Sequence, residues 1–251
     1  MLYTEQKLTP IEKYNNIFVK RDDLYTIAGV CGGKARTCYA IAKHAKGIIT
    51  AGSRVSPQVL LASAIAKHLG IPCRVHVPSG NFTPELTATK ANGAIIIQHK
   101  PGYNSVIIKR AKDDAIANPE YTYIPFGMEC WEAIEQTKYQ VQNIPKGVKR
   151  IVVPVGSAMT LAGILNGLVE YKMNIPVVGI VVGADPVKRL DHYAPIFWRK
   201  KCTLINSEDN YHLSRNNVYL DNILLDPIYE AKCLPYIKPG DLFWIVGIRN
   251  I

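Results

Sequence analysis

The sequence lacks several features that would assign it to a common class. No stretch of about 18 apolar residues occurs, so we expect no membrane-spanning helix. The N-terminal residues 1–7 lack the apolar core of a secretory signal peptide, which predicts a cytoplasmic protein. The six cysteines are scattered, without a Cys-x-x-Cys pair or a His-x3-His partner, so neither a metal site nor a disulfide framework is expected.

Two nucleotide-binding motifs are also missing. Residues 28–35 resemble a Walker A motif only loosely, because the glycine spacing differs and Ala35 stands where Ser or Thr would bind magnesium. No Rossmann glycine fingerprint follows an expected strand. The 251 residues are nevertheless enough for one large domain or for two joined lobes.

Positive charge is the unusual feature of the composition. Thirty Lys and Arg against twenty Asp and Glu give a net charge of +10. This excess suits an anionic cofactor, an anionic substrate or nucleic acid, and it equally suits a soluble protein with no such partner. The basic and aromatic run at Trp198, Arg199, Lys200 and Lys201 is the local candidate for following nucleic-acid phosphates.

Short apolar strands alternate with helices along most of the chain. We expect strands at residues 16–19, 47–50, 73–77, 94–97, 121–124, 150–155, 176–182 and 242–246, and helices at residues 36–46, 56–69, 83–92, 104–117, 128–142, 161–172 and 226–235. Residues 186–222 show no clean period. The alternation predicts βαβ units with parallel sheets, and therefore the α/β fold class.

Three turns each follow an expected strand and begin a helix, where ligands bind in parallel α/β sheets. The first delivers Lys34 to the positive end of a helix dipole, which favours the neutral, nucleophilic amine. The second, residues 51–58, holds Arg54 and the expected N-cap Ser56. The third, residues 156–160, leaves backbone N–H groups for an anion such as phosphate. Taken singly, such turns are also typical of ordinary surface loops.

Taken together, the motifs resemble the fold-type-II pyridoxal-phosphate (PLP) enzymes of the tryptophan synthase β family. The nearest branch is that of 1-aminocyclopropane-1-carboxylate deaminase and D-cysteine desulfhydrase. Lys20–Leu24 followed by Gly32–Arg36 resembles the lysine motif of this family, which places Lys34 on the Schiff-base lysine. Residues 225–232, Leu-Asp-Pro-Ile-Tyr-Glu-Ala-Lys, are similar to the family's Asp-Pro-Val-Tyr motif. The resemblance covers about residues 16–247.

The resemblance implies a fold and an arrangement of domains. It implies a two-lobed, three-layer αβα fold with mostly parallel sheets, like that of tryptophan synthase β. Residues 1–36 and 126–251 would form a larger, cofactor-binding lobe, and residues 37–125 would form a smaller inserted lobe. PLP would occupy the cleft between these lobes.

The resemblance also implies roles for individual residues. Tyr229 would lie beside the cofactor ring, and the carboxylate of Glu230 would face the pyridine nitrogen and keep it protonated, which strengthens the ring as an electron sink. Arg54 is a candidate anchor for a substrate carboxylate on charge pairing alone. The full set is Lys34, Ser56, Tyr229 and Glu230 as catalytic residues; Lys34, Gln58, Gly156, Ser157, Ala158, Met159, Thr160 and Glu230 as cofactor-binding residues; and Arg54 and Ser56 as substrate-binding residues.

The chain departs from the family pattern at three places. Gly33 precedes the lysine where the family has asparagine. Pro57 replaces the asparagine that bonds the 3′ oxygen of the cofactor, so Gln58 or a water would have to substitute, or the cofactor would sit differently. Residues 245–251 stand where relatives carry His-Thr-Gly-Gly and a further helix. These differences concern the substrate more than the fold.

We therefore expect a PLP-dependent lyase or deaminase-like enzyme. It would act at Cα of a small amino-acid substrate, by elimination, deamination, racemisation or decarboxylation, and relatives of this kind are commonly homodimers. One alternative is a PLP enzyme that acts on an amino-acid group attached to nucleic acid, as in DNA hypermodification of an aminoacylated thymidine. The other is a catalytically inactive PLP-fold protein that serves as a binding or scaffold module.

Overall fold

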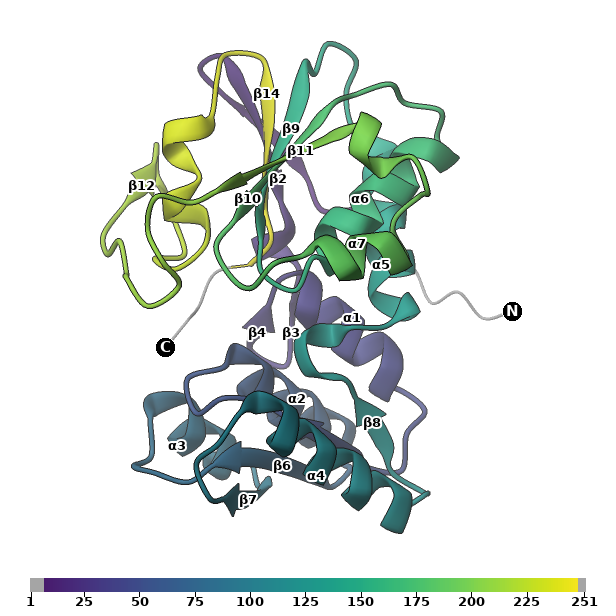
Figure 1. Cartoon of the computed structure of the whole chain (residues 1–251), viewed down its shortest axis with the longest axis vertical. Helices are drawn as coiled ribbons and strands as arrows, with labels where there is room; N and C mark the ends of the chain where they lie inside the picture. Colours follow the sequence, from purple (N-terminus) through teal and green to yellow (C-terminus); the bar gives the residue numbers. More distant parts are fainter. Residues whose placement is uncertain (1–6, 248–251) are drawn as a thin grey trace. The chain divides into compact units, whose positions relative to one another are not determined.

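The structure is a computed structural model that describes residues 7–247. The chain forms two compact units (Figure 1). The large unit comprises residues 7–25 and 130–247, and the small unit comprises residues 26–129. Residues 26–36 and 126–129 therefore belong to the small unit, whereas the resemblance assigns them to the larger lobe.

The large unit is built on a six-stranded sheet with the strand order β1-β2-β14-β9-β10-β11. Only the β1–β2 pair is antiparallel, and the other neighbours are parallel. The strands are β1 (Ile11–Tyr14), β2 (Ile17–Arg21), β9 (Arg150–Val155), β10 (Val177–Val181), β11 (Cys202–Asn206) and β14 (Asp241–Ile245). Strand β11 lies in the region whose sequence shows no clean period.

One group of helices in the large unit consists of α5 (Trp131–Gln140), α6 (Met159–Glu170) and α7 (Val187–Tyr193). Helices α5 and α6 approach closely, because a Cβ atom on Gly163 would lie 2.5 Å from Cβ of Thr137. Likewise, a Cβ on Gly167 would lie 2.5 Å from Cγ2 of Val141 and 2.9 Å from the carbonyl oxygen of Lys138. Glycine is therefore required at this helix contact.

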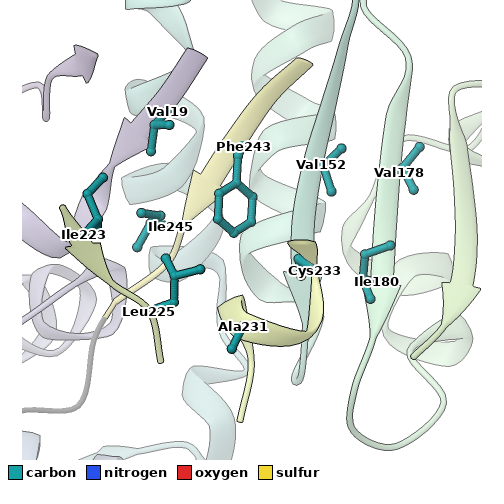
Figure 2. Close-up of a cluster of buried hydrophobic side chains, with 10 residues drawn as sticks. All are labelled: Val19, Val152, Val178, Ile180, Ile223, Leu225, Ala231, Cys233, Phe243 and Ile245. Atoms are coloured by element: carbon teal, nitrogen blue, oxygen red, sulfur yellow. The ribbon is translucent and has the colours of Figure 1, made fainter. Parts of the chain in front are cut away.

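A second apolar layer of the large unit packs against its sheet, as Figure 2 shows. Phe243 and its neighbours on β2, β9 and β10 contact a C-terminal segment of short elements. These are β12 (Tyr219–Leu220), β13 (Ile223–Leu224) and the 3₁₀ turns η5 (Glu230–Lys232) and η6 (Leu234–Tyr236). The buried cluster contains Val19, Val152, Val178, Ile180, Ile223, Leu225, Ala231, Cys233, Phe243 and Ile245.

The prediction of a helix near residues 226–235 is wrong, because this segment forms two separate 3₁₀ turns, η5 and η6. The side chain of Asp226 accepts hydrogen bonds from the N–H groups of Ile228 (2.9 Å) and Tyr229 (3.0 Å). These bonds have the pattern of a helix N-cap, so they do not account for the break between the two turns. Pro235 then lacks the N–H that an α-helix would need at its position.

The small unit is built on a parallel four-stranded sheet with the order β7-β6-β5-β8. Its strands are β5 (Ile48–Ala51), β6 (Cys73–Pro78), β7 (Ile95–His99) and β8 (Thr122–Ile124), and its helices are α1 (Gly33–Ala42), α2 (Pro57–Leu69), α3 (Pro84–Ala91) and α4 (Asn104–Ala117). A hairpin of β3 (Thr26–Ile27) and β4 (Val30–Cys31) precedes α1.

Alternating side chains of β5 face different helices. Ile49 and Ala51 pack against Ile107 and Ala111 of α4. Thr50 points the other way, and its hydroxyl accepts a hydrogen bond from the side chain of Gln58 on α2 (3.0 Å). Helices therefore cover both faces of this sheet, as the α/β pattern predicts.

Helices α2 and α3 begin where the sequence predicts. Ser56 Oγ accepts the N–H of Gln58 (3.3 Å), and Thr83 Oγ1 accepts the N–H of Leu86 (3.3 Å). In each case proline occupies the first turn, where its missing N–H costs nothing. Within residues 7–247, no helix is both long and apolar enough to cross a membrane.

The α5–α6 contact makes a prediction about stability. Replacing helical glycine by alanine normally stabilises a helix by about 0.5–1 kcal/mol. Gly167→Ala should instead lower the free energy of unfolding by about 1–3 kcal/mol, because the added methyl overpacks the contact with Val141. Urea unfolding followed by tryptophan fluorescence reports on this unit, since Trp131, Trp198 and Trp244 all lie in it.

The matched control is Val169→Ala, at an exposed position of the same helix. Its free energy of unfolding should stay within about 0.5 kcal/mol of the wild type. A Gly167→Ala chain as stable as this control would contradict the close approach of the two helices.

Candidate active site

The loop Gly156–Thr160 joins β9 to α6 and presents backbone N–H groups. Ala158 caps the helix in the left-handed conformation (φ 68°). Residues 159 and 160 lie in the first turn of α6, whose N–H groups have no partner within the helix. Together with the positive end of the helix dipole, this geometry suits a phosphate. The loop thus has a backbone geometry that a phosphate site would use, and its role in binding phosphate stays a prediction.

Tyr229 packs directly against this loop. A Cβ atom on Gly156 would lie 2.9 Å from Cε1 and 3.0 Å from Oη of Tyr229, so only glycine fits there. On its other side, the ring of Tyr229 meets the ring of Tyr211 at a centroid distance of 6.1 Å. Tyr211 was not predicted from the sequence, because it lies in the aperiodic region and matches no motif quoted above.

Glu230 is completely buried beside Tyr229. One carboxyl oxygen, Oε1, accepts hydrogen bonds from the N–H groups of Val246 (2.9 Å) and Gly247 (3.4 Å). The other oxygen, Oε2, is buried and has no hydrogen-bond partner among residues 7–247. Burial and the nearby Asp226 raise the pKa of Glu230 well above its usual range. A cation or a charged N–H group placed at Oε2 would stabilise the carboxylate.

Lys34 lies in the small unit, as the second residue of α1. Gly32 caps this helix with φ 92°, a conformation that glycine adopts without strain. The helix begins three residues before the predicted start at Arg36 and ends at Ala42, and the side chain of Lys34 is exposed. Lys34 therefore stands at the positive end of the α1 dipole.

The turn between β5 and α2 places Arg54 and Ser56 three and five residues beyond the strand. Nη1 of Arg54 donates to the carbonyl oxygen of Asn81 (2.9 Å), and the hydroxyl of Thr83 donates to the carbonyl oxygen of Arg54 (2.6 Å). The guanidinium covers Gly80, where a Cβ atom would lie 2.6 Å from Nη1. Arg54 is therefore held in place by the loop that follows β6.

Gln58 has a different role from the predicted one. Its amide nitrogen donates to Thr50 Oγ1 (3.0 Å) and to the carbonyl oxygen of Pro125 (2.8 Å), and its Oε1 accepts the N–H of Gly127 (2.7 Å). Both amide protons are thus used inside the small unit. Gln58 joins α2 to β5 and the end of β8, and it has no proton left to donate to a cofactor oxygen.

Most side chains of the basic run near Trp198 make hydrogen bonds or ion pairs within the protein. Trp198 is buried, and its indole nitrogen donates to Asp191 Oδ1 (3.0 Å). Arg199 stacks on Trp198 and makes two bonds with the same carboxylate (2.5 and 3.0 Å). Lys201 donates to the side chain of Asn174. The indole is therefore not exposed for stacking on a nucleic-acid base.

Comparisons with known proteins identify the family of the chain and its fold. The model of the family described as "Pyridoxal-phosphate dependent enzyme" matches residues 3–214. The chain belongs to this family. No curated protein matches the sequence.

Solved structures of PLP enzymes share the fold. An ACC deaminase homologue superposes with a TM-score of 0.79 at 21% identity, over 96% of this chain and 89% of that chain. An O-acetylserine-dependent cystathionine β-synthase from Helicobacter pylori gives 0.70 at 16% identity, over 100% and 97%. Threonine deaminase isoform 2 from Solanum lycopersicum gives 0.63 at 17% identity, over 94% and 75%. The chain thus has the fold of the fold-type-II PLP enzymes.

The residues of the large unit fit PLP. The phosphate suits the N–H groups of the Gly156–Thr160 loop, and the ring suits the face of Tyr229. A protonated pyridine nitrogen would supply the partner that Oε2 of Glu230 lacks among the described residues. Lys34 of the small unit stays the predicted Schiff-base lysine.

Glu230 makes a prediction about pH. Its pKa is raised in the folded chain, so the folded state binds more protons than the unfolded state above about pH 4.5, and stability falls as the pH rises from there. Glu230→Gln removes this loss, because a neutral amide costs less to bury than a carboxylate. Glu230→Gln should therefore be more stable, relative to wild type, at pH 8 than at pH 5. Its free energy of unfolding minus that of wild type should increase by about 1.4 kcal/mol per pKa unit of the shift.

The measurement is urea unfolding without added PLP, followed by tryptophan fluorescence at both pH values. Glu208→Gln, at an exposed position, is the control and should leave the pH dependence unchanged. Equal pH dependence in wild type and Glu230→Gln would contradict a buried, proton-binding carboxyl group.

The contact between Gly156 and Tyr229 makes a prediction about cofactor binding. Gly156→Ala would push the Tyr229 ring aside, at a cost of about 1–3 kcal/mol, and should weaken PLP binding about tenfold or more. Gly183→Ala is the matched control, because its Cβ would meet its nearest neighbour, Cα of Gly156, at an ordinary 3.5 Å. Titration with PLP, followed by quenching of tryptophan fluorescence, measures the PLP affinity of both variants. Similar affinities in Gly156→Ala and Gly183→Ala would refute the predicted clash.

Proposed function

We propose that the chain is a PLP-dependent enzyme that breaks a bond at Cα of a small amino-acid substrate. The buried Oε2 of Glu230 carries the proposal, because it has no partner among residues 7–247 and a protonated ring nitrogen would provide one. Bound PLP supplies an electron sink for the negative charge that develops at Cα. A carboxylate at the ring nitrogen strengthens this sink, which favours deamination or elimination.

The large unit would hold both ends of the cofactor, which are its phosphate and its ring nitrogen. The N–H groups of residues 157–160 would bind its phosphate, with the hydroxyls of Ser157 and Thr160 beside them. Tyr229 would hold the ring in place, and its position is in turn limited by Gly156 and Tyr211. Glu230, fixed by the N–H groups at the end of β14, would keep the ring nitrogen protonated.

Residues of the small unit would contribute the reacting groups. Lys34 would hold PLP through its Nζ, and the same amine would take up or return the proton at Cα of the substrate. Ser56 keeps a hydroxyl proton while its oxygen caps α2, so it would assist proton transfer or bind the substrate carboxylate. Arg54 would bind that carboxylate by charge pairing.

The second candidate is a non-catalytic PLP-fold protein. Pro57 removes the side chain that bonds the 3′ oxygen in the family pattern, and both amide protons of Gln58 are used elsewhere. Such a chain would take up PLP weakly and without chemistry. The basic run at Trp198 gives the nucleic-acid alternative no support, because Trp198 and Arg199 are bound to Asp191.

Lys34 provides the decisive test. The purified chain incubated with PLP should turn yellow, and borohydride reduction followed by peptide mass spectrometry should place the cofactor on Lys34. Lys34→Ala should lose the visible band, because no amine remains to hold the cofactor covalently. A screen of D- and L-amino acids for release of ammonia and a 2-oxo acid then identifies the reaction.

Lys46→Ala is the matched control, since Lys46 is exposed just beyond the end of α1. It should keep the band. A wild-type chain that stays colourless with excess PLP would favour the non-catalytic candidate, and reduction on a different lysine would contradict the role of Lys34.

A further inference from the structure

A chain of three ionisable side chains crosses one face of the small unit. His76 on β6 is buried, and its Nε2 lies 2.8 Å from Oδ2 of Asp114 on α4. Its Nδ1 lies 2.9 Å from Nε2 of His99 on β7. The planes of the two imidazoles are nearly parallel (14°), and their centroids lie 5.1 Å apart. These residues belong to no motif of the candidate active site.

The hydrogen bonds fix the positions of the protons. Asp114 accepts two bonds from Arg74 (2.7 and 2.9 Å), so it is held as a carboxylate and accepts the Nε2 proton of His76. The bonds from Arg74 and His76 lower the pKa of Asp114 although burial opposes this. In the neutral pair, His76 Nδ1 then has a lone pair and His99 must donate to it. The contact between His76 Nδ1 and His99 Nε2 holds one proton. Two imidazolium rings would repel each other across it.

His99 connects this chain to the loop that holds Arg54. The N–H of Ser79 donates to the carbonyl oxygen of His99 (2.6 Å), and the side chain of Gln98 donates to the carbonyl oxygen of Gly80 (3.3 Å). The same loop contacts the guanidinium of Arg54 through Gly80 and the carbonyl oxygen of Asn81. The position of Arg54 thus depends on the end of β7.

We propose that the Asp114–His76–His99 chain positions residues 79–82, and through them Arg54, and that it releases this loop when His99 gains a positive charge. Substrate binding would then weaken in mildly acidic solution. This consequence for substrate rests on the proposed function, whereas the positioning of the loop does not.

The charged groups around the histidines support release on acidification. Asp114 faces His76 and is itself paired with Arg74, and the positive charge of Arg110 on α4 acts on His99. Tyr121 is the other ionisable group near Arg74. Burial, His76 and Arg110 lower the pKa of His99, so the neutral ring is the form that the fold selects. The stability that the neutral ring contributes is lost as the pH falls below about 6.5, the usual pKa of histidine.

Two substitutions of His99 separate hydrogen bonding from titration. His99→Gln can still donate an N–H to His76 but cannot gain a charge, whereas His99→Leu can do neither. His44→Gln removes an exposed imidazole at the end of α1 and serves as the control.

Amide hydrogen exchange of the peptide covering residues 79–83, read by mass spectrometry on the chain without PLP, tests the positioning of the loop. At pH 7, protection in wild type, His99→Gln and His44→Gln should agree, and in His99→Leu it should fall about tenfold, the effect of one lost hydrogen bond. Between pH 7 and pH 5, protection should fall in wild type and His44→Gln but not in His99→Gln. An equal fall in His99→Gln would overturn the proposal, even if His99→Leu does not fold.

A second measurement tests the link to substrate. With PLP-loaded chain, the apparent Kd for D- or L-alanine is taken from the change in the visible band at pH 7 and pH 5. The Kd should rise several-fold on acidification in wild type and not in His99→Gln. If exchange follows the proposal but Kd does not, Arg54 is not the carboxylate anchor and the proposed function fails at that residue alone. If the chain takes up no PLP, the exchange measurement decides the proposal.

Discussion

The buried carboxyl group of Glu230 sets the strongest constraint on the large unit. An ion of this kind costs several kcal/mol to remove from water unless hydrogen bonds and opposite charge replace its hydration. Two N–H groups at the end of β14 replace part of it at Oε1, and Oε2 has no replacement among residues 7–247. Such a group is tolerated as a neutral acid or next to a cation. This is the physical reason for regarding the position as a binding site and not as a structural hydrogen bond.

The sequence predicted those features that depend on neighbouring residues. The caps at Ser56 and Thr83, the glycine before Lys34 and the small residues before α6 act within one or two turns of the chain. Such local rules can be read from one sequence. The parallel sheets followed from the alternation of strands and helices. The family match and the similar solved structures agree with the fold and the family expected from these features.

Contacts between residues that are far apart in the sequence could not be predicted from it. Nothing in residues 186–222 marks Tyr211 as the neighbour of Tyr229, and nothing in one strand marks His76 as the partner of His99. Gln58 was expected at the cofactor because it follows Pro57, yet its bonds run to Thr50 and to the segment after β8. Side-chain hydrogen bonding across strands and helices is decided by the packing of the whole unit.

The environment of Gln58 also explains how the small unit tolerates Pro57. Proline at the first position of α2 needs no donor there, and Ser56 caps the helix in the ordinary way. Gln58 then secures the same helix to β5 and β8, so the turn that carries Arg54 and Ser56 is fixed at both ends. Pro57 therefore removes one donor toward a cofactor, while the hydrogen bonds that hold the turn are kept. Under the proposed function, in which Arg54 and Ser56 bind the carboxylate of an amino acid, this substitution would change the contacts of the cofactor ring and not the contribution of the turn.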